Sequence, residues 1–189
     1  MKTNTKNTTN HGFTLIEMVG VLAVIAILAA LLVPKIFAAI NDSRFSSSIS
    51  TINSCKTATM DYFGKAGNFP AVGTADFDSV LVRSNCLERP LACRLAETGA
   101  HMQVTNVALC AGAAKDYLLD GATSLPTTAG QVVECVLNGV ARADAYELSR
   151  RIDGDTLSVS TIANADTLGR VVYEATTDPV DVYIYIAHK

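Results

Sequence analysis

The sequence predicts an α+β fold, in which a long N-terminal α-helix packs on a small C-terminal antiparallel β-sheet domain. Two observations lead to this class. An apolar run over residues 13–33 passes into a stretch with helical periodicity, and residues 156–187 are rich in β-branched and aromatic side chains. The 189 residues leave room for one globular domain of about 100 to 130 residues beside a membrane-sized helix.

The apolar run is long enough to span a bilayer. From Met18 to Val33, 16 residues carry no charge and no polar side chain, and a start at Phe13 extends the run to 21 residues, roughly 31 Å as a helix. The preceding twelve residues contain Lys2 and Lys6 but no acid. The positive-inside rule therefore predicts a cytoplasmic N-terminus, with the rest of the chain across the membrane.

Glu17 lies within this run, where an acid costs about 2.5 to 3.5 kcal/mol. A secretory signal would have a shorter apolar region followed by a small-residue cleavage site, whereas here the helical pattern continues. A plain single-span anchor fits the length but leaves Glu17 unexplained. A third interpretation comes from a family resemblance.

The motif GFTLIEM at residues 12–18, followed by an apolar run and Pro34, resembles the prepilin signature of type IV pilins and of type II secretion pseudopilins. The resemblance implies a bacterial inner-membrane protein with a single span and a periplasmic C-terminal domain. It implies cleavage after Gly12 by prepilin peptidase, a membrane aspartyl peptidase, and N-methylation of Phe13. It also implies that an inner-membrane assembly platform draws the helix into a filament with further copies of this chain and other pilin-like subunits.

The resemblance gives Glu17 a role in assembly. After cleavage Phe13 carries a free ammonium group, and Glu17 lies four residues along the same helix face. The family implies that Glu17 pairs with the Phe13 ammonium of an adjoining subunit, which sets the subunit register. The alternative is that Glu17 snorkels to the membrane interface, where an acid near a helix start complements the helix dipole.

Gly20 and Pro34 complete the expected assembly residues. Gly20 weakens a helix by roughly 1 kcal/mol relative to Ala, but small residues permit close helix approach in membranes. Pro34 removes one backbone hydrogen bond and would kink or locally open the helix. In related pilins the corresponding stretch melts during assembly. A helix boundary at the membrane surface is an equally good interpretation of Pro34.

Helical periodicity continues beyond Pro34 to about Phe63, with Gly64 and Gly67 as helix-ending signals. The predicted buried stripe consists of Phe45, Ile49, Ile52, Cys55, Thr59 and Tyr62. The expected divisions are a cleaved leader at 1–12, a membrane or filament-core half at 13–34, an amphipathic half at 35–64 and a globular head at 65–189.

The first part of the head has a mixed pattern. Residues 80–99 are predicted to be loop with short helices, because Pro90 interrupts them. Residues 102–110 partly alternate and predict a strand, whereas 130–140 fit a helix or a strand. Residues 143–152 predict a short helix.

The C-terminal part is β-rich in three segments, 156–162, 168–176 and 180–187. The last two predict a hairpin joined by residues 177–179. Its final strand should bury Val182, Ile184 and Ile186 and turn Tyr183 and Tyr185 to the other face.

Five cysteines in a membrane-anchored chain fit an oxidising compartment, and the odd number allows at most two intramolecular bridges. Cys86 and Cys93 could close a short bridge, and Cys110 could pair with Cys135. Cys55, on the helix stripe, is the candidate for a buried unpaired thiol. Many type IV pilins close a C-terminal loop with two cysteines, and the lack of any after Cys135 mildly favours a pseudopilin or a minor, divergent pilin.

Other chemistry is sparse. The three histidines lack metal-ligand spacing, and no phosphate loop or catalytic grouping is present. We therefore expect no enzyme, no metal and no cofactor. The acids of residues 153–155, and Asp178 with Asp181, could bind calcium, although Asp and Gly also form ordinary turns. A net charge of −3 with scattered basic residues argues against a nucleic-acid partner.

The expected function is that of a structural subunit of a type IV pilus-like or type II secretion pseudopilus filament. One alternative keeps the anchor but makes the head a minor or tip binding module for adhesion or cargo selection. An exposed apolar or aromatic patch on the head would favour that alternative. A membrane-tethered enzyme is a further alternative for which the sequence offers no site.

Overall fold

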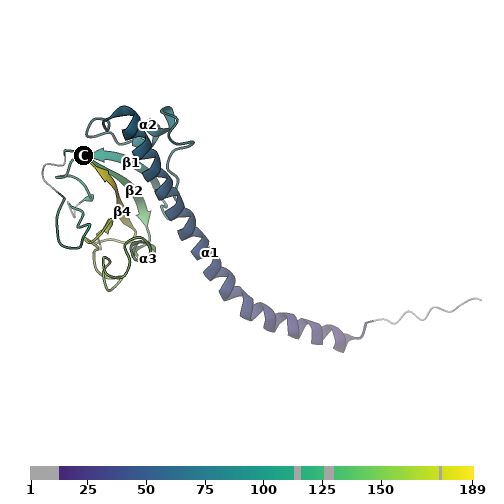
Figure 1. Ribbon diagram of the computed structural model, residues 1–189. Coiled ribbons are helices and arrows are strands. Elements are labelled where there is room, and N and C mark those ends of the chain that lie inside the picture. Colours follow the sequence, from purple (N-terminus) through teal and green to yellow (C-terminus); the bar gives the residue numbers. More distant parts are fainter. Residues whose placement is uncertain (1–12, 113–115, 126–129, 175) are drawn as a thin grey trace, which may run out of the picture. The chain divides into compact units, whose positions relative to one another are not determined.

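A computed structural model describes residues 13–112, 116–125, 130–174 and 176–189. The chain forms two units, Met1–Asp42 and Ser43–Lys189, and helix α1 (Leu15–Ala66) contributes to both. The second unit also contains α2 (Phe77–Arg83), β1 (Gly99–Thr105), β2 (Val132–Val140), α3 (Arg142–Asp153), β3 (Val171–Tyr173) and β4 (Val180–His188) (Figure 1). The predicted α+β class, a long N-terminal helix with a small antiparallel sheet, is confirmed.

One face of the C-terminal half of α1 is buried in the second unit. The buried side chains recur mainly at spacings of three and four residues: Phe45, Ser48, Ile52, Cys55, Ala58 and Thr59. The helix ends at Ala66, slightly beyond the expected end. Gly67, with φ of 71°, donates its N–H to the carbonyl of Phe63 over 2.8 Å, which closes the last turn.

The sheet contains four antiparallel strands in the order β1-β2-β4-β3. Strand β2 lies in the middle, where Cys135 is opposite Met102 of β1 and Ile184 of β4. The two last strands of the chain pair as predicted, since Val171 is opposite Ile184. The segment 130–140, which fitted either a helix or a strand, is largely strand β2.

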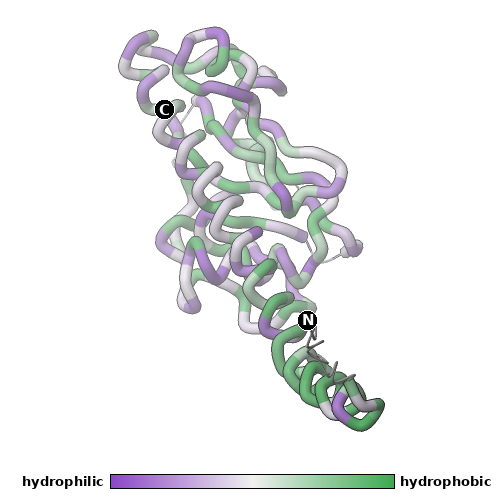
Figure 2. The backbone as a smooth tube through the Cα atoms, turned by 90° about the vertical axis from the view of Figure 1, so that its right-hand side faces the viewer, coloured by the Kyte–Doolittle hydropathy of each residue, from purple (hydrophilic) through white to green (hydrophobic). Residues whose placement is uncertain are grey.

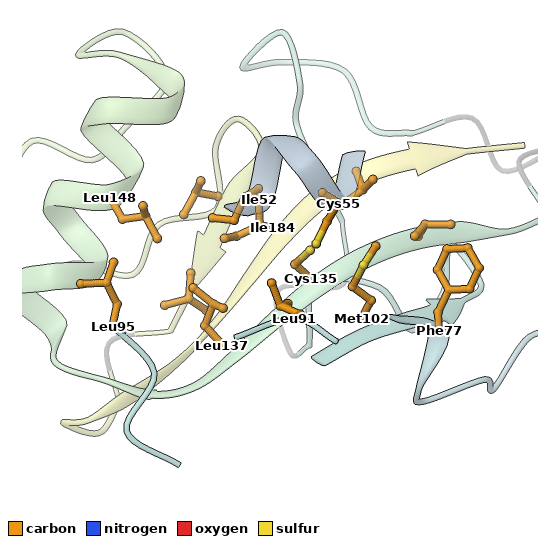
Figure 3. Close-up of a cluster of buried hydrophobic side chains, with 14 of the residues drawn as sticks. Ile52, Cys55, Phe77, Leu91, Leu95, Met102, Cys135, Leu137, Leu148 and Ile184 are labelled. Atoms are coloured by element: carbon orange, nitrogen blue, oxygen red, sulfur yellow. The ribbon is translucent and has the colours of Figure 1, made fainter. Parts of the chain in front are cut away.

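Strand side chains alternate between two hydrophobic clusters, as the pleat requires. The larger cluster joins α1, α2 and α3 to one sheet face; Figure 3 shows Ile52, Phe77 and Leu148 around the central strands. In β4, Val182, Ile184 and Ile186 belong to this cluster, and Tyr183 and Tyr185 pack against the smaller cluster on the other face. The predicted core, with the sheet on the amphipathic half of the long helix, is confirmed.

Glu134 is fully buried in the centre of β2 and organises the second face of the sheet. Its carboxylate accepts hydrogen bonds from Gln103 Nε2 (2.6 Å), the backbone N–H of Ala111 (2.8 Å) and the Tyr117 hydroxyl (2.6 Å). Burial, followed by the neighbouring carboxylate, holds the pKa of Tyr117 well above its usual range, so the phenol remains a donor. Through Ala111 and Tyr117, Glu134 holds part of the segment that follows β1 against the sheet.

Helix α3 was predicted at 143–152 and is observed with one further residue at each end. Its first backbone N–H, that of Arg142, donates to Asp178 Oδ1 over 3.1 Å. Gly154, with φ of 79°, ends the helix and donates its N–H to the carbonyl of Arg150. A side chain from the β3–β4 connection therefore supplies the N-terminal partner that the local sequence lacks.

Three β predictions were wrong in extent. Residues 156–162 form turns and bends instead of a strand. The strand expected at 102–110 starts earlier and ends at Thr105, and Leu109 N–H closes a turn on the Asn106 carbonyl. The strand expected at 168–176 is limited to residues 171–173.

Asp153 makes the stability of the head depend on pH. Its Oδ2 accepts the backbone N–H groups of Arg170 and Val171, both at 2.8 Å, yet burial raises its pKa to about 6 from 3.8. The Asp153 carboxyl therefore binds its proton more tightly in the native state than in the unfolded chain. As the pH rises from about 4 to about 6, the free energy of unfolding falls. In Asp153→Asn this fall should shrink, by on the order of 1 kcal/mol after allowance for solvent screening.

Chemical unfolding of the full chain in detergent at pH 4 and pH 7 checks this expectation. Asp120 is exposed, and hydrogen bonds from Thr123 and Ala122 lower its pKa. Because its pKa is shifted in the opposite direction, Asp120→Asn is the control and should keep the wild-type difference in stability between pH 4 and pH 7. An Asp153→Asn chain whose stability changes with pH as much as that of the wild type would contradict the assignment.

Candidate functional site

Residues 13–42 of the first unit present an exposed apolar helical surface. Every residue from 13 to 42 is exposed, including Leu15 at 82% and Phe37 at 64%. Within the described residues α1 is the one helix long and apolar enough to cross a membrane. Figure 2 shows this end of the tube in green, the colour of hydrophobic residues, over most of its length.

Glu17 forms a capping box with Thr14 at the start of α1. Its Oε2 accepts hydrogen bonds from the backbone N–H and from the hydroxyl of Thr14, each at 2.8 Å. In return, the backbone N–H of Glu17 approaches Thr14 Oγ1 at 3.4 Å. Such reciprocal bonds satisfy donors that the first helical turn leaves free and hold the acid at the amino end of the helix.

Thr14 is the functional residue that the sequence reasoning missed. The spacing Thr-x-x-Glu before an apolar run is the local signal of a capping box, and residues 14–17 carry it. The prediction explained Glu17 through a partner in another subunit or through the membrane interface. The structure adds a partner within the chain, which fixes the carboxylate near Phe13.

Phe13, Glu17 and Gly20 share one face of the helix. Together with Val21, Val24 and Ile25 they line a shallow depression on it. A Cβ added at Gly20 would meet nothing within 4 Å, so contacts within the chain do not require glycine there. The missing side chain leaves room beside the carboxylate.

Pro34 lies inside α1, and the helix continues beyond it to Ala66. The interpretation of Pro34 as a helix boundary is therefore wrong. Pro34 has no N–H to donate, so the helix has lost one backbone bond at that point. Gly12, the expected cleavage position, and the rest of the expected leader at 1–12 lie outside the described residues.

All five cysteines lie in the second unit as free thiols. Cys110 belongs to the smaller cluster and Cys135 to the larger one, so the sheet separates the pair that we considered. Cys86 and Cys93 are both half-buried in the connection between α2 and β1. Cys55 is buried as expected, and it belongs to the same cluster as Cys135.

The acids considered for calcium are engaged with the protein. Asp155 pairs with Arg150 at 2.6 Å, and Asp178 and Asp181 accept backbone N–H groups of Arg142 and Gly139. Within the described residues no three or more His, Cys, Asp or Glu side chains are grouped so that they could hold a metal ion. These contacts favour the interpretation of the acids as turn and cap residues.

A comparison with protein families identifies the N-terminal segment. The prokaryotic N-terminal methylation motif matches residues 7–33, which include the capping box and the depression at Gly20. This motif is the signature of type IV pilins and pseudopilins. No curated protein matches the chain. The motif and the apolar helix fit a pilin-like structural protein that is anchored in the inner membrane and assembles with other pilin-type subunits.

Proposed function

From the pilin-type methylation motif at its N-terminus, we propose that the chain is a structural subunit of a type IV pilus-like or type II secretion pseudopilus filament. Prepilin peptidase cuts after Gly12 and Phe13 becomes N-methylated. The helix then leaves the inner membrane and packs against the helices of neighbouring subunits, while the head lies on the periplasmic side.

The observation that carries this proposal is the unburied apolar surface of residues 13–42. Its large apolar side chains are about half exposed or more, from Val33 at 48% to Leu15 at 82%. Burying one such side chain is worth about 1.5 to 3 kcal/mol, so a surface of this size is stable in lipid or in a bundle of helices, not in water. A filament core supplies that environment after the helix leaves the membrane.

The capping box supports the role of Glu17 in register. Both bonds from Thr14 go to Oε2, and within the described residues no hydrogen bond to Oε1 is found. This second oxygen is available to the Phe13 ammonium of a neighbouring subunit that reaches the depression lined by Glu17 and Gly20. In an apolar core an unpaired charge is costly. The favoured register of neighbouring subunits is therefore the one in which Glu17 pairs with the Phe13 ammonium.

The terminal chemistry of the chain tests the processing step. We expect mass spectrometry of the chain from wild-type cells to find a mature protein that starts at Phe13 with one added methyl group. In cells that lack prepilin peptidase the same measurement should find the uncut chain. An intact Met1 terminus in wild-type cells would contradict the proposal.

A bulky side chain at Gly20 should affect assembly more than it affects the isolated helix. Gly20→Ala removes a helix-weakening residue, worth roughly 1 kcal/mol, and meets no neighbour within its own chain. Gly20→Leu would fill the depression beside Glu17, and we expect about a tenfold loss of filament yield with normal processing. Filaments from Gly20→Leu at wild-type yield would show that subunits do not approach at this face.

A further inference from the structure

Cys55 and Cys135 face one another between α1 and the sheet. Cys55 belongs to the buried stripe of α1 and is 1% exposed, and Cys135 is fully buried in β2. The interaction between the two thiols lowers the pKa of Cys55 and raises that of Cys135. Figure 3 shows the two sulfur atoms pointing toward one another from the helix and the strand.

We propose that Cys55 and Cys135 form a disulfide that joins α1 to β2 when the head folds outside the cytoplasm. The proposal rests on the periplasmic location of the head in the proposed function. Both residues lie in the unit Ser43–Lys189 and share its larger cluster, so the bond needs no rearrangement of one unit against the other.

The bond requires an oxidant, which we take to be the disulfide of a thiol–disulfide oxidoreductase or a small disulfide. One cysteine thiolate attacks this disulfide, forms a mixed disulfide and releases the first oxidant thiol. The thiolate of the second cysteine then attacks the mixed disulfide and releases the second. The two cysteines lose two electrons and two protons, and the oxidant disulfide is reduced to two thiols.

The other cysteines are placed less well for Cys135. Cys110 lies in the smaller cluster, on the far face of the sheet. Cys86 lies 3.8 Å from Lys65 Nζ and donates to the Ser84 carbonyl at 3.5 Å. Cys93 is close enough to Cys135 for a charge on it to raise the pKa of Cys135, which makes Cys93 the competitor. Cys55 shares the larger cluster with Cys135, and its sulfur points toward that of Cys135 in Figure 3.

Burial sets the order of events. The interaction with Cys55 and desolvation hold the pKa of Cys135 well above its usual range, whereas the interaction with Cys135 lowers the pKa of Cys55. In the folded head Cys55 is 1% exposed and Cys135 is fully buried, so an oxidant does not reach either sulfur. Oxidation should therefore occur before the sheet closes on α1. Once formed, the bond is shielded from reductant, because both residues are buried.

Disulfide mapping of the full chain tests the proposal. Membranes are lysed in an alkylating reagent, and the chain is digested without reduction for mass spectrometry. We expect a linked peptide pair containing Cys55 and Cys135, with Cys86, Cys93 and Cys110 alkylated. Alkylation of both Cys55 and Cys135, or a link between Cys93 and Cys135, in an exported chain would overturn the proposal.

Thermal unfolding in detergent gives a second readout. Reductant present during unfolding should lower the Tm of the wild type by on the order of 5 to 15 °C. It should leave the Tm of Cys55→Ala and of Cys135→Ala unchanged, because neither variant can form the bond. Cys86→Ala is the matched control and should keep the full reductant sensitivity. An equal response in all four chains would contradict the assignment.

Protease accessibility of the head in intact spheroplasts separates this proposal from the proposed function. A protected, cytoplasmic head with free thiols would refute the proposed topology. In that case the purified full chain is refolded in a glutathione redox buffer. Formation of the Cys55–Cys135 link there would support the pairing, and its failure would overturn it.

Discussion

Glu17→Ala should reduce filament assembly at least tenfold while cleavage after Gly12 continues. The substitution removes the carboxylate that Thr14 holds at the amino end of α1, and with it the proposed partner of the Phe13 ammonium of a neighbouring subunit. An unpaired ammonium in an apolar core is costly. The measurement is the amount of sheared or envelope-bound filament relative to the amount of processed chain in membranes.

Two variants separate charge from capping. Glu17→Gln keeps the size of the side chain and an oxygen for Thr14, but it removes the charge, so its assembly should fail like that of Glu17→Ala. Thr14→Ala removes the hydroxyl from the capping box but keeps the charge of Glu17, and it should lose far less filament. Normal filament yield from Glu17→Gln would contradict the pairing role.

Glu134→Ala should lower the unfolding free energy of the head by about 3 to 5 kcal/mol. The substitution leaves two buried donors, the Ala111 N–H and the Tyr117 hydroxyl, and the half-buried Gln103 amide without their acceptor. It also removes most of a fully buried side chain and so leaves a cavity on that face of the sheet. Urea unfolding of the full chain in detergent measures the loss. Protease cleavage within residues 106–112 and 116–125 should increase because Ala111 and Tyr117 lose their bonds to Glu134.

Glu147→Ala is the matched control for Glu134→Ala. Glu147 lies on the surface of α3 and pairs with Arg151 one helical turn away at 2.7 Å. Exposed pairs of this kind contribute about 0.3 to 0.5 kcal/mol, so this variant should unfold nearly as the wild type does. Equal losses in the two variants would contradict the role of Glu134.

The long helix and the final hairpin were predictable because their signals are local. The apolar run, the buried stripe at three- and four-residue spacings and the glycines after Phe63 all belong to one continuous segment. The alternation of Val182, Ile184 and Ile186 likewise repeats with the period of a strand. The box at Thr14 and Glu17 is also local, and its signal was present in the sequence.

The remaining features depend on residues far apart in the chain. Glu134 bonds to side chains and backbone 17 to 31 residues away, so nothing near it in the sequence explains an acid within an apolar strand. The contact between Cys55 and Cys135 depends on how the sheet packs on α1. Residues 156–162 have the composition of a strand, yet at Tyr173 the outer edge of β3 pairs with Asp166 instead, through two backbone hydrogen bonds of 2.9 Å.

The most direct test of the central claim is to isolate filaments from native cells and read the N-terminus of this chain within them by mass spectrometry. The filaments are sheared from the surface or extracted from the envelope and imaged with an antibody against the head. We expect labelled filaments that contain a chain starting at N-methylated Phe13. An uncut chain that starts at Met1, remains in the membrane and labels no filament would contradict the account.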